Sequence, residues 1–408
     1  MKPEDFLVQE ESGLPVSQDP AEYAVFRLEK SEWDTFDLLG LLSRRLAVPA
    51  SALSVGGIKD RYGRTSQLLS VRCGGVRPAE LEDRNFRSVF LGYAPRKATA
   101  GDVRGNRFRI VLRDIGSREA EGFAARAGAA FRWGVPNFYD EQRFGSARHG
   151  AGFMGKSIFL GRREEAVRLW LTPSKHDDQK TRKLKKCAVE NWGHWRECLP
   201  LAFGEYRKVL AYLAENPRAF RKALSLLDRK FLVFVLNAYQ SYLFNEILAR
   251  RLRTLCAAEG IAVYRVRYNV GTFVFYEALT EPLLARLSAL SLPVPGWDTR
   301  AEDPEVRGAL EETLAAEGIV LEDLRVRQMS GVSAHGVERA ALVVPERISA
   351  PEMLDDDLYP GKKKMLLEFF LPRGCYATIL IKRIGAPAMP EAAPDGAGGT
   401  DSGSGVPG

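Results

Sequence analysis

The sequence has few of the residues from which disulfide frameworks and metal sites are built. It contains only five cysteines, an odd number, and no two of them form a CxxC pair. It has only four histidines, and none belongs to an HExxH motif. Widely spaced cysteines predict reduced thiols, and without ligand spacing we expect no metal ion. The four histidines are His149, His176, His194 and His335.

Long apolar runs are also missing. No stretch approaches the eighteen consecutive apolar residues that indicate a membrane-spanning helix. The first residues, Met1 to Phe6, include Lys2, Glu4 and Asp5 and contain no apolar core of a secretion signal. We therefore expect a cytoplasmic protein without membrane contact.

The composition is that of a globular protein with a mild excess of positive charge. With 408 residues and 45% hydrophobic content, the chain is long enough for two ordinary domains. Lysine and arginine total 59 against 52 acidic residues, which gives a net charge of +7. This balance suits a polyanionic partner. The basic run 180–186 is either a solvated helix face or a phosphate contact.

One polar loop, residues 56–67, combines a single carboxylate with several cations. Lys59, Arg61 and Arg64 surround Asp60 in the sequence. Because nearby cations favour a carboxylate, we expect Asp60 to be ionised. An ionised aspartate can act as a nucleophile, a charge stabiliser or a base. The same pattern is also compatible with a solvated turn that carries incidental ion pairs.

The periodicity of apolar residues predicts strand-rich ends and a helical middle. Helices are expected from Asp34 to just before Pro49, from Ser117 to Trp133, and over 228–252, 282–290 and 304–317. Strands are expected over 6–8, 23–28, 68–73, 107–113, 341–345, 365–372 and 376–382. The last two strands are expected to form a hairpin that turns at Arg373 and Gly374, and 263–276 a hairpin around Asn269. In 107–113 charged and apolar residues alternate, which predicts one buried and one basic face.

A dense aromatic segment follows the second of these helices. Residues 136–145 hold three aromatic rings together with Gln142 and Arg143. Such a segment is typical either of core packing with a polar rim or of a surface on which bases stack and phosphates bind.

We expect four regions along the chain. The change to helical segments places a boundary near Gly150, and the return to strands places another near residue 337. The predicted regions are 1–150, the first part of a catalytic domain; 151–336, an inserted domain; 337–384, the closing strands of the catalytic domain; and 385–408, a disordered tail. The tail is rich in Gly, Ala, Pro, Ser and Asp.

Several of these stretches together resemble the successive motifs of the TruD family of tRNA pseudouridine synthases. The resemblance spans about residues 3–384. It rests on Pro3–Phe6, Gly57–Arg61 with Thr65 and Gln67, Gly105–Phe108, Pro136–Tyr139 with Gln142–Gly145, and Leu371–Thr378.

This resemblance implies an isomerase that converts a uridine of tRNA to pseudouridine without cofactor or metal. The family's usual target is uridine 13 in the D arm. The implied fold class is α+β: a mixed, largely antiparallel sheet forms the catalytic domain, and a mostly helical α/β TRUD domain is inserted in it. The implied partner is tRNA, and we expect a monomer.

The resemblance also assigns roles to particular residues. Asp60 matches the family's catalytic aspartate, which attacks C1′ or abstracts a sugar proton; the sequence leaves both routes open. Phe108 matches the aromatic residue expected to stack on the target uracil, and Asn106 lies on the same strand face. The remaining substrate-binding candidates are Phe6 and Phe144 as pocket walls, and Lys59, Gln142 and Arg143 as residues that order the pocket or bind phosphate.

Two other functions compete with this one. A catalytically silent RNA-binding protein on the same scaffold would use the basic strand faces and aromatic loops, but would not need both Asp60 and Phe108. A metal-dependent nuclease would need clustered carboxylates or histidines, and the sequence has no such cluster.

Overall fold

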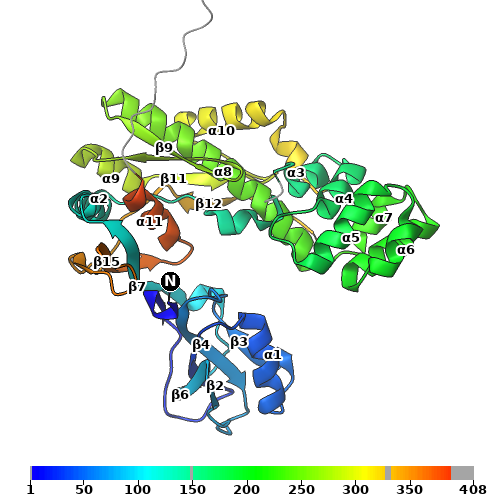
Figure 1. The fold of residues 1–408 in the computed structure, drawn as a ribbon, viewed down its shortest axis with the longest axis horizontal. Coiled ribbons are helices and arrows are strands. Elements are labelled where there is room, and N and C mark those ends of the chain that lie inside the picture. Colours follow the sequence, from blue (N-terminus) through cyan, green and yellow to red (C-terminus); the bar gives the residue numbers. More distant parts are fainter. Residues whose placement is uncertain (1, 148–149, 327–331, 387–408) are drawn as a thin grey trace, which may run out of the picture.

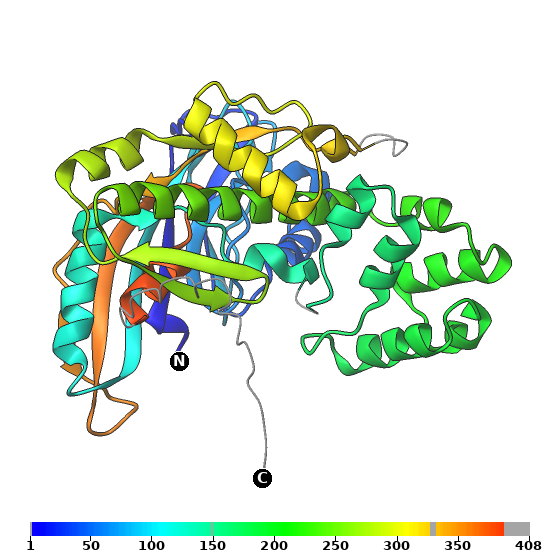
Figure 2. The same ribbon diagram turned by 90° about the horizontal axis from the view of Figure 1, so that it is seen from above.

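The structure is a computed structural model that describes residues 2–147, 150–326 and 332–386; Figures 1 and 2 show it in two views. The strands are β1 Phe6–Ser12, β2 Tyr23–Lys30, β3 Leu53–Val55, β4 Arg64–Arg72, β5 Glu82–Asp83, β6 Phe86–Ala94, β7 Val103–Gly116, β8 Val135–Pro136, β9 Val263–Tyr268, β10 Gly271–Tyr276, β11 Ser291–Val294, β12 Val337–Ala340, β13 Leu342–Val343, β14 Glu352–Asp355 and β15 Lys362–Pro372. The α-helices are α1 Thr35–Arg45, α2 Ala120–Trp133, α3 Met154–Phe159, α4 Arg163–Leu171, α5 Gln179–Glu190, α6 Gly204–Glu215, α7 Phe220–Ser225, α8 Arg229–Ala258, α9 Glu281–Ala289, α10 Pro304–Glu317 and α11 Ala377–Gly385. Short 3-10 helices are η1 Pro3–Asp5, η2 Ala50–Ala52, η3 Ala100–Asp102, η4 Glu141–Ala147, η5 Trp195–Leu201 and η6 Leu321–Leu324.

A nine-stranded sheet forms the centre of the molecule. Its order is β14-β15-β7-β1-β4-β2-β6-β5, and β3 pairs with β4 at its side. Within the described residues β1 and β4 run parallel, and the other pairs of this sheet are antiparallel. The predicted α+β class with a mixed, largely antiparallel sheet is therefore confirmed.

The two ends of the chain meet in this sheet. The long strand β15, near the C-terminus, pairs with β7 from Lys362 opposite Gly116 to Pro372 opposite Gly105, and the two strands lie side by side in Figure 2. On its other edge β7 pairs with β1. Strands from both sides of the helical middle thus build one sheet.

Helices cover one face of the sheet at two separate places. Helix α1 begins after Asp34, whose carboxylate accepts hydrogen bonds from the amides of Phe36 and Asp37, as an N-cap should. Its buried Leu38 and Leu42 pack on the β2–β4 part of the sheet. Helices α2 and α11 pack on β7 and β15, where Phe108 and Phe369 belong to the same apolar cluster as Phe131 of α2.

The prediction of a strand over 376–382 was wrong, because this segment forms helix α11. The β-branched isoleucines there suggested a strand, but Ala377, Leu380 and Ile384 recur at helical spacing and share one buried face. That face packs in the cluster that contains Phe369. The expected closing hairpin is therefore a strand, a turn and a helix.

Between the two halves of the sheet the chain is mostly helical, as predicted. Figure 1 shows α3 to α7 as a lobe beside the long helix α8, and the β9–β10 hairpin follows α8. The basic run 180–186 lies in α5. Of the predicted tail, Gly385 ends α11, and residues 387–408 lie outside the described residues. The described helices include none that is long and apolar enough to cross a membrane.

Candidate active site

The loop that carries Asp60 connects β3 to β4 and is held by a buried lysine. Lys30, at the end of β2, is 1% exposed. Its ammonium group donates hydrogen bonds to the carbonyl oxygens of Trp33 (3.0 Å), Lys59 (3.1 Å) and Asp60 (2.8 Å). Burial lowers the pKa of Lys30, whereas the charges of Asp60 and Asp34 oppose this change. Two of these bonds hold the loop backbone at Lys59 and Asp60, and the third joins the loop to Trp33.

Two further contacts fix the same loop. The hydroxyl of Thr35, at the start of α1, accepts a hydrogen bond from the amide of Lys59 (3.2 Å) and donates one to its carbonyl (3.3 Å). On the other side of Asp60, Gly63 approaches Phe6 so closely that a Cβ there would lie 2.7 Å from Phe6 Cδ1. A contact this short leaves no room for a side chain at position 63.

Beside Asp60 lies a buried group of polar side chains. The ammonium group of Lys59 lies 2.8 Å from Oε2 of Glu10 and donates a hydrogen bond to Oδ1 of Asn106 (2.6 Å). The side chains of Lys59 and Glu10 are only 9% and 1% exposed. A buried pair like this is stable only while both partners are present, because either charge alone would be uncompensated. The structure thus brings the predicted Lys59 and Asn106 together.

The electrostatic environment of Asp60 differs from the prediction. The residue is solvent-exposed, yet desolvation by the surrounding protein atoms raises the pKa of its carboxyl above the usual 3.8. Lys30 and Lys59 oppose this shift without cancelling it. Arg61 and Arg64 are directed elsewhere: Arg61 donates to the carbonyl of Glu32 (3.3 Å), and Arg64 lies 3.8 Å from Glu29. The sequence could not reveal this desolvation.

Aromatic rings lie next to these polar groups on the same face of the sheet. Strand register places Val8 opposite Phe108 and Glu10 opposite Asn106, so Asn106 and Phe108 share a face, as predicted. Phe108 is 6% exposed. Its ring stacks on Phe369, with centroids 5.4 Å apart, and lies 6.2 Å from the ring of Phe6.

The predicted residues of the aromatic segment lie in η4. Gln142 is exposed, and Arg143 donates a hydrogen bond to the hydroxyl of Ser241 on α8 (3.1 Å). Phe144 is fully buried. Among the described residues its ring contacts are with Phe153 and Tyr268, and not with Phe6 or Phe108. This position corresponds to packing against the helical part of the chain rather than to a pocket wall beside Phe6.

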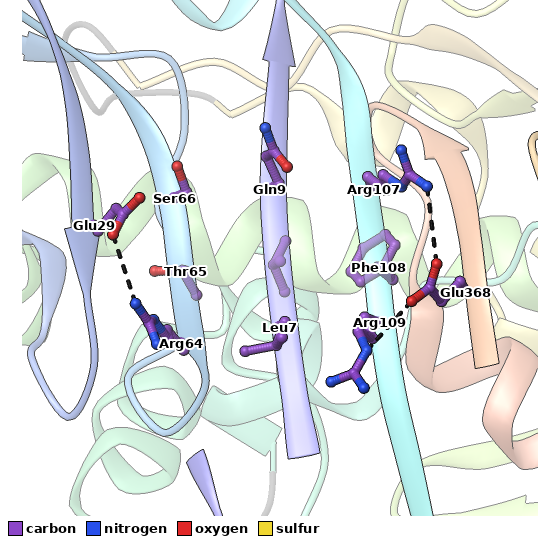
Figure 3. A pocket seen from close by; sticks show the side chains of 11 residues that line it. Leu7, Gln9, Glu29, Arg64, Thr65, Ser66, Arg107, Phe108, Arg109 and Glu368 are labelled. Carbon is purple, nitrogen blue, oxygen red and sulfur yellow. Dashed lines mark ion pairs between the residues drawn. The ribbon is translucent and has the colours of Figure 1, made fainter. Parts of the chain in front are cut away.

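The opposite face of the same strands has a shallow cavity of about 380 Å³, drawn in Figure 3. Its charged groups are paired: Glu368 lies 3.3 Å from Arg109 and 3.8 Å from Arg107. The predicted basic face of β7 therefore exists, but strand alternation directs it away from Asn106 and Lys59. Side chains that line the cavity include Leu7, Gln9, Glu29, Arg64, Ser66, Arg107, Arg109 and Glu368.

Three residues of the site were not identified from the sequence: Glu10, Lys30 and Phe369. Two of them had a usable signal. Glu10 continues the alternation that buries Val8, and Lys30 continues the alternation that buries Phe26 and Leu28. A charged residue at an apolar position of a strand has to find a partner, and this marks it as unusual. Phe369 had no such signal, because it is one of several apolar residues in β15.

The described part of the chain contains no cluster of three or more His, Cys, Asp or Glu side chains that could hold a metal ion. The site therefore consists of one carboxylate on a fixed loop, a buried lysine–glutamate–asparagine group and an aromatic wall. Such a set can position a planar polar ring and supply an oxygen nucleophile or base.

Comparison with known proteins identifies relatives over almost the whole chain. The family model described as tRNA pseudouridine synthase D (TruD) matches residues 1–384. A "Probable tRNA pseudouridine synthase D 1" of Methanococcus maripaludis is 32% identical, covering 94% of this chain and 98% of that protein. A "tRNA pseudouridine synthase D" of Aquifex aeolicus is 26% identical, covering 94% and 96%. A crystal structure from Methanosarcina mazei, provisionally described as tRNA pseudouridine synthase D, is similar with a TM-score of 0.70 and 27% identity, covering 94% and 92%.

Proposed function

The chain belongs to the TruD family of tRNA pseudouridine synthases, and we propose that it converts uridine 13 in the D arm of tRNA to pseudouridine, with Asp60 as the catalytic residue. The observation that carries this proposal is the rigid display of one carboxylate beside a buried, polar and aromatic surface. Asp60 is an exposed residue on a loop whose backbone is held by Lys30 and Thr35.

The reaction breaks the bond between C1′ and N1, turns the freed uracil and joins C5 to C1′. The proton on C5 leaves and N1 gains one, so product and substrate are isomers. Asp60 either attacks C1′ as a nucleophile or removes a sugar proton as a base, and both routes use the ionised carboxylate. The pKa of Asp60 is raised, and a more basic carboxylate is both a better base and a better nucleophile, so this shift supports either route.

The remaining residues are proposed to hold the base. The target uridine has to leave its stack, at a cost of about a few kcal/mol. One face of Phe108 is covered by Phe369, so the uracil stacks on its other face or edge, a contact that contributes roughly 1–3 kcal/mol. Lys59 and Asn106 bind the polar edge of the uracil or orient Asp60. Arg143 and Gln142 contact the RNA backbone from η4.

We also propose the division of the chain into parts. Residues 1–150 and 337–384 form the catalytic domain, in agreement with the pairing of β7 with β15, and residues 151–336 form the inserted TRUD domain. The protein acts in the cytoplasm as a monomer, with tRNA as substrate and without cofactor or metal.

The decisive experiment maps pseudouridine directly. Purified protein is incubated with unmodified tRNA that carries a uridine at position 13, the product is labelled with carbodiimide, and stops are mapped by reverse transcription. Asp60→Asn is tested in parallel. A single stop at position 13 that is absent with Asp60→Asn supports reaction, target and catalytic residue together. Salt-sensitive binding without a stop on any tRNA would instead favour a silent RNA-binding protein.

A further inference from the structure

Three large apolar side chains around the Asp60 loop are exposed to solvent. Phe36 is 61% exposed, Ile58 64% and Tyr62 80%. Ile58 and Tyr62 lie two residues before and two residues after Asp60. Phe36 follows Thr35, whose hydroxyl bonds both backbone groups of Lys59. We call these three side chains the apolar rim. Single exposed apolar residues are common, but several around one loop indicate a binding surface.

The exposure of the apolar rim does not come from a loose loop. Lys30 holds the carbonyl groups of Lys59 and Asp60, and the amide of Phe36 is bonded to the N-capping carboxylate of Asp34 (2.8 Å). The side chains therefore extend into solvent from a fixed backbone. A surface that is apolar, rigid and exposed loses little conformational entropy when a partner covers it.

The charges beside the apolar rim indicate which chemical class covers it. The guanidinium group of Arg61 lies over the ring of Tyr62, 5.9 Å from its centroid, and Arg61 and Arg64 are both exposed. Stacking rings next to arginines are typical of surfaces that bind unpaired bases and their phosphates. An apolar protein partner would be a poorer match, because the arginines would have to lose water against it.

We propose that the apolar rim contacts the bases on either side of the target nucleotide and occupies the space that this nucleotide leaves when it turns out of its stack. This inference rests on the proposed function. Proteins that open a nucleic acid stack insert apolar side chains between neighbouring bases. Ile58 and Tyr62 are each two residues from Asp60 in the chain and exposed, so they can meet the neighbours of a nucleotide bound at Asp60.

The test uses a fluorescent base rather than turnover. The nucleotide next to the target uridine in a full-length tRNA is replaced by 2-aminopurine, whose fluorescence is quenched by the adjacent base and rises when that base leaves the stack. The tRNA is bound to Asp60→Asn, which keeps the complex from reacting. We expect a rise with Asp60→Asn alone and at most a small rise when Ile58→Ser and Tyr62→Ser are added. Asp60→Asn combined with Tyr62→Phe keeps the ring and should keep the rise.

The matched control is Val320→Ser, because Val320 is similarly exposed (57%) but lies in the helical part of the chain, before η6. In the reactive protein Ile58→Ser with Tyr62→Ser should lower kcat/KM about tenfold, and Val320→Ser should leave it unchanged.

The proposal is overturned if fluorescence does not rise with Asp60→Asn, or rises equally with and without the rim residues. It is also overturned if the rim variants change only self-association, measured by sedimentation. Failure of the proposed function itself is seen separately, as absence of pseudouridine with the wild-type protein.

Discussion

Two sets of buried side-chain oxygens, one on α8 in the helical middle of the molecule and one on β4 in the central sheet, differ in their hydrogen bonds. On α8, Asn245 is 1% exposed and its amide is saturated: it accepts from the amide of Tyr139 (2.9 Å) and donates to the carbonyl of Tyr139 (2.9 Å) and the hydroxyl of Tyr268 (3.2 Å). In the sheet, Thr65 and Gln67 are equally buried. Yet among the described residues Oγ1 of Thr65 and Oε1 of Gln67 have no hydrogen-bond partner.

This difference separates structural polar groups from those that are available to a ligand. A buried oxygen without a partner costs free energy and is uncommon in native proteins. Thr65 and Gln67 lie on β4, directly after the Asp60 loop. We interpret the unpartnered oxygens of Thr65 and Gln67 on β4 as groups to which substrate binds, whereas Asn245 of α8 joins the backbone of Tyr139 to Tyr268 of the β9–β10 hairpin.

The largest effect should follow from Lys59→Met. Removal of the ammonium group leaves Glu10 buried without its partner, and breaking such a pair costs about 3–5 kcal/mol. Turnover should fall as well, because Asn106 loses its hydrogen bond to Lys59. Urea unfolding at pH 7 measures the free energy of unfolding, and carbodiimide mapping measures the rate.

The double variant Lys59→Met with Glu10→Gln is the control for this prediction. It removes both charges, so it should recover much of the lost stability while the enzyme stays slow. If Lys59→Met alone unfolds at the same urea concentration as the wild type, the pair of Lys59 and Glu10 does not stabilise the folded state.

A smaller and purely structural effect is expected for Asn245→Ala. Both backbone groups of Tyr139 lose their partner, which should lower the free energy of unfolding by about 1–3 kcal/mol. The rate per folded molecule should not change. Asn216→Ala is the matched control, since its amide donates one exposed hydrogen bond to Tyr212, and its effect should stay within about 0.5 kcal/mol. An equal loss of stability in both variants would contradict the structural role of Asn245.

The sequence predicted features that depend on local patterns and missed those that depend on contacts between distant segments. Local patterns were sufficient for α1, where Asp34 caps a periodic apolar face, and for β7, where charged and apolar residues alternate. The resemblance to a family suggested Asp60 and Phe108 as site residues. Helix α11 was missed because its β-branched isoleucines suggested a strand, although Ala377, Leu380 and Ile384 recur at helical spacing.

Contacts between distant segments could not be predicted. The environment of Asp60 depends on Lys30 from β2, and that of Lys59 on Glu10 from β1. The sequence lists Arg61 and Arg64 as the neighbours of Asp60, but their side chains point to Glu32 and Glu29. Proximity in the chain therefore gave the wrong direction for the pKa of Asp60.

A still smaller change in stability is expected for Thr65→Val. The hydroxyl of Thr65 has no hydrogen-bond partner among the described residues, so its replacement by a methyl group should change the free energy of unfolding by less than about 1 kcal/mol. Turnover should fall if the hydroxyl binds substrate. Thr313→Val is the comparison: Thr313 is also 1% exposed, but its hydroxyl donates to the carbonyl of Ala309 (2.7 Å). That variant should lose about 1 kcal/mol and keep its rate. If instead Thr65→Val lost stability and kept its rate, Thr65 would be a structural residue.

The subtlest effect is the dependence of stability on pH that Asp60 introduces. Desolvation raises the pKa of Asp60 in the folded state above the usual 3.8, against the charges of Lys30 and Lys59. The folded state therefore binds this proton more tightly than the unfolded chain does, and stability from this group is lost as pH rises through the folded pKa. Asp60→Asn has no such loss, so it should be more stable than the wild type at pH 7, by a margin that shrinks towards pH 3.8. Urea unfolding of both proteins at pH 7 and pH 4 measures the margin.

The rate of the wild type should in turn decline on the acid side at a pH above 3.8, because the reaction uses the carboxylate. A wild type more stable than Asp60→Asn at pH 7 would mean that Lys30 and Lys59 outweigh desolvation, and that Asp60 is a structural anion like Glu10.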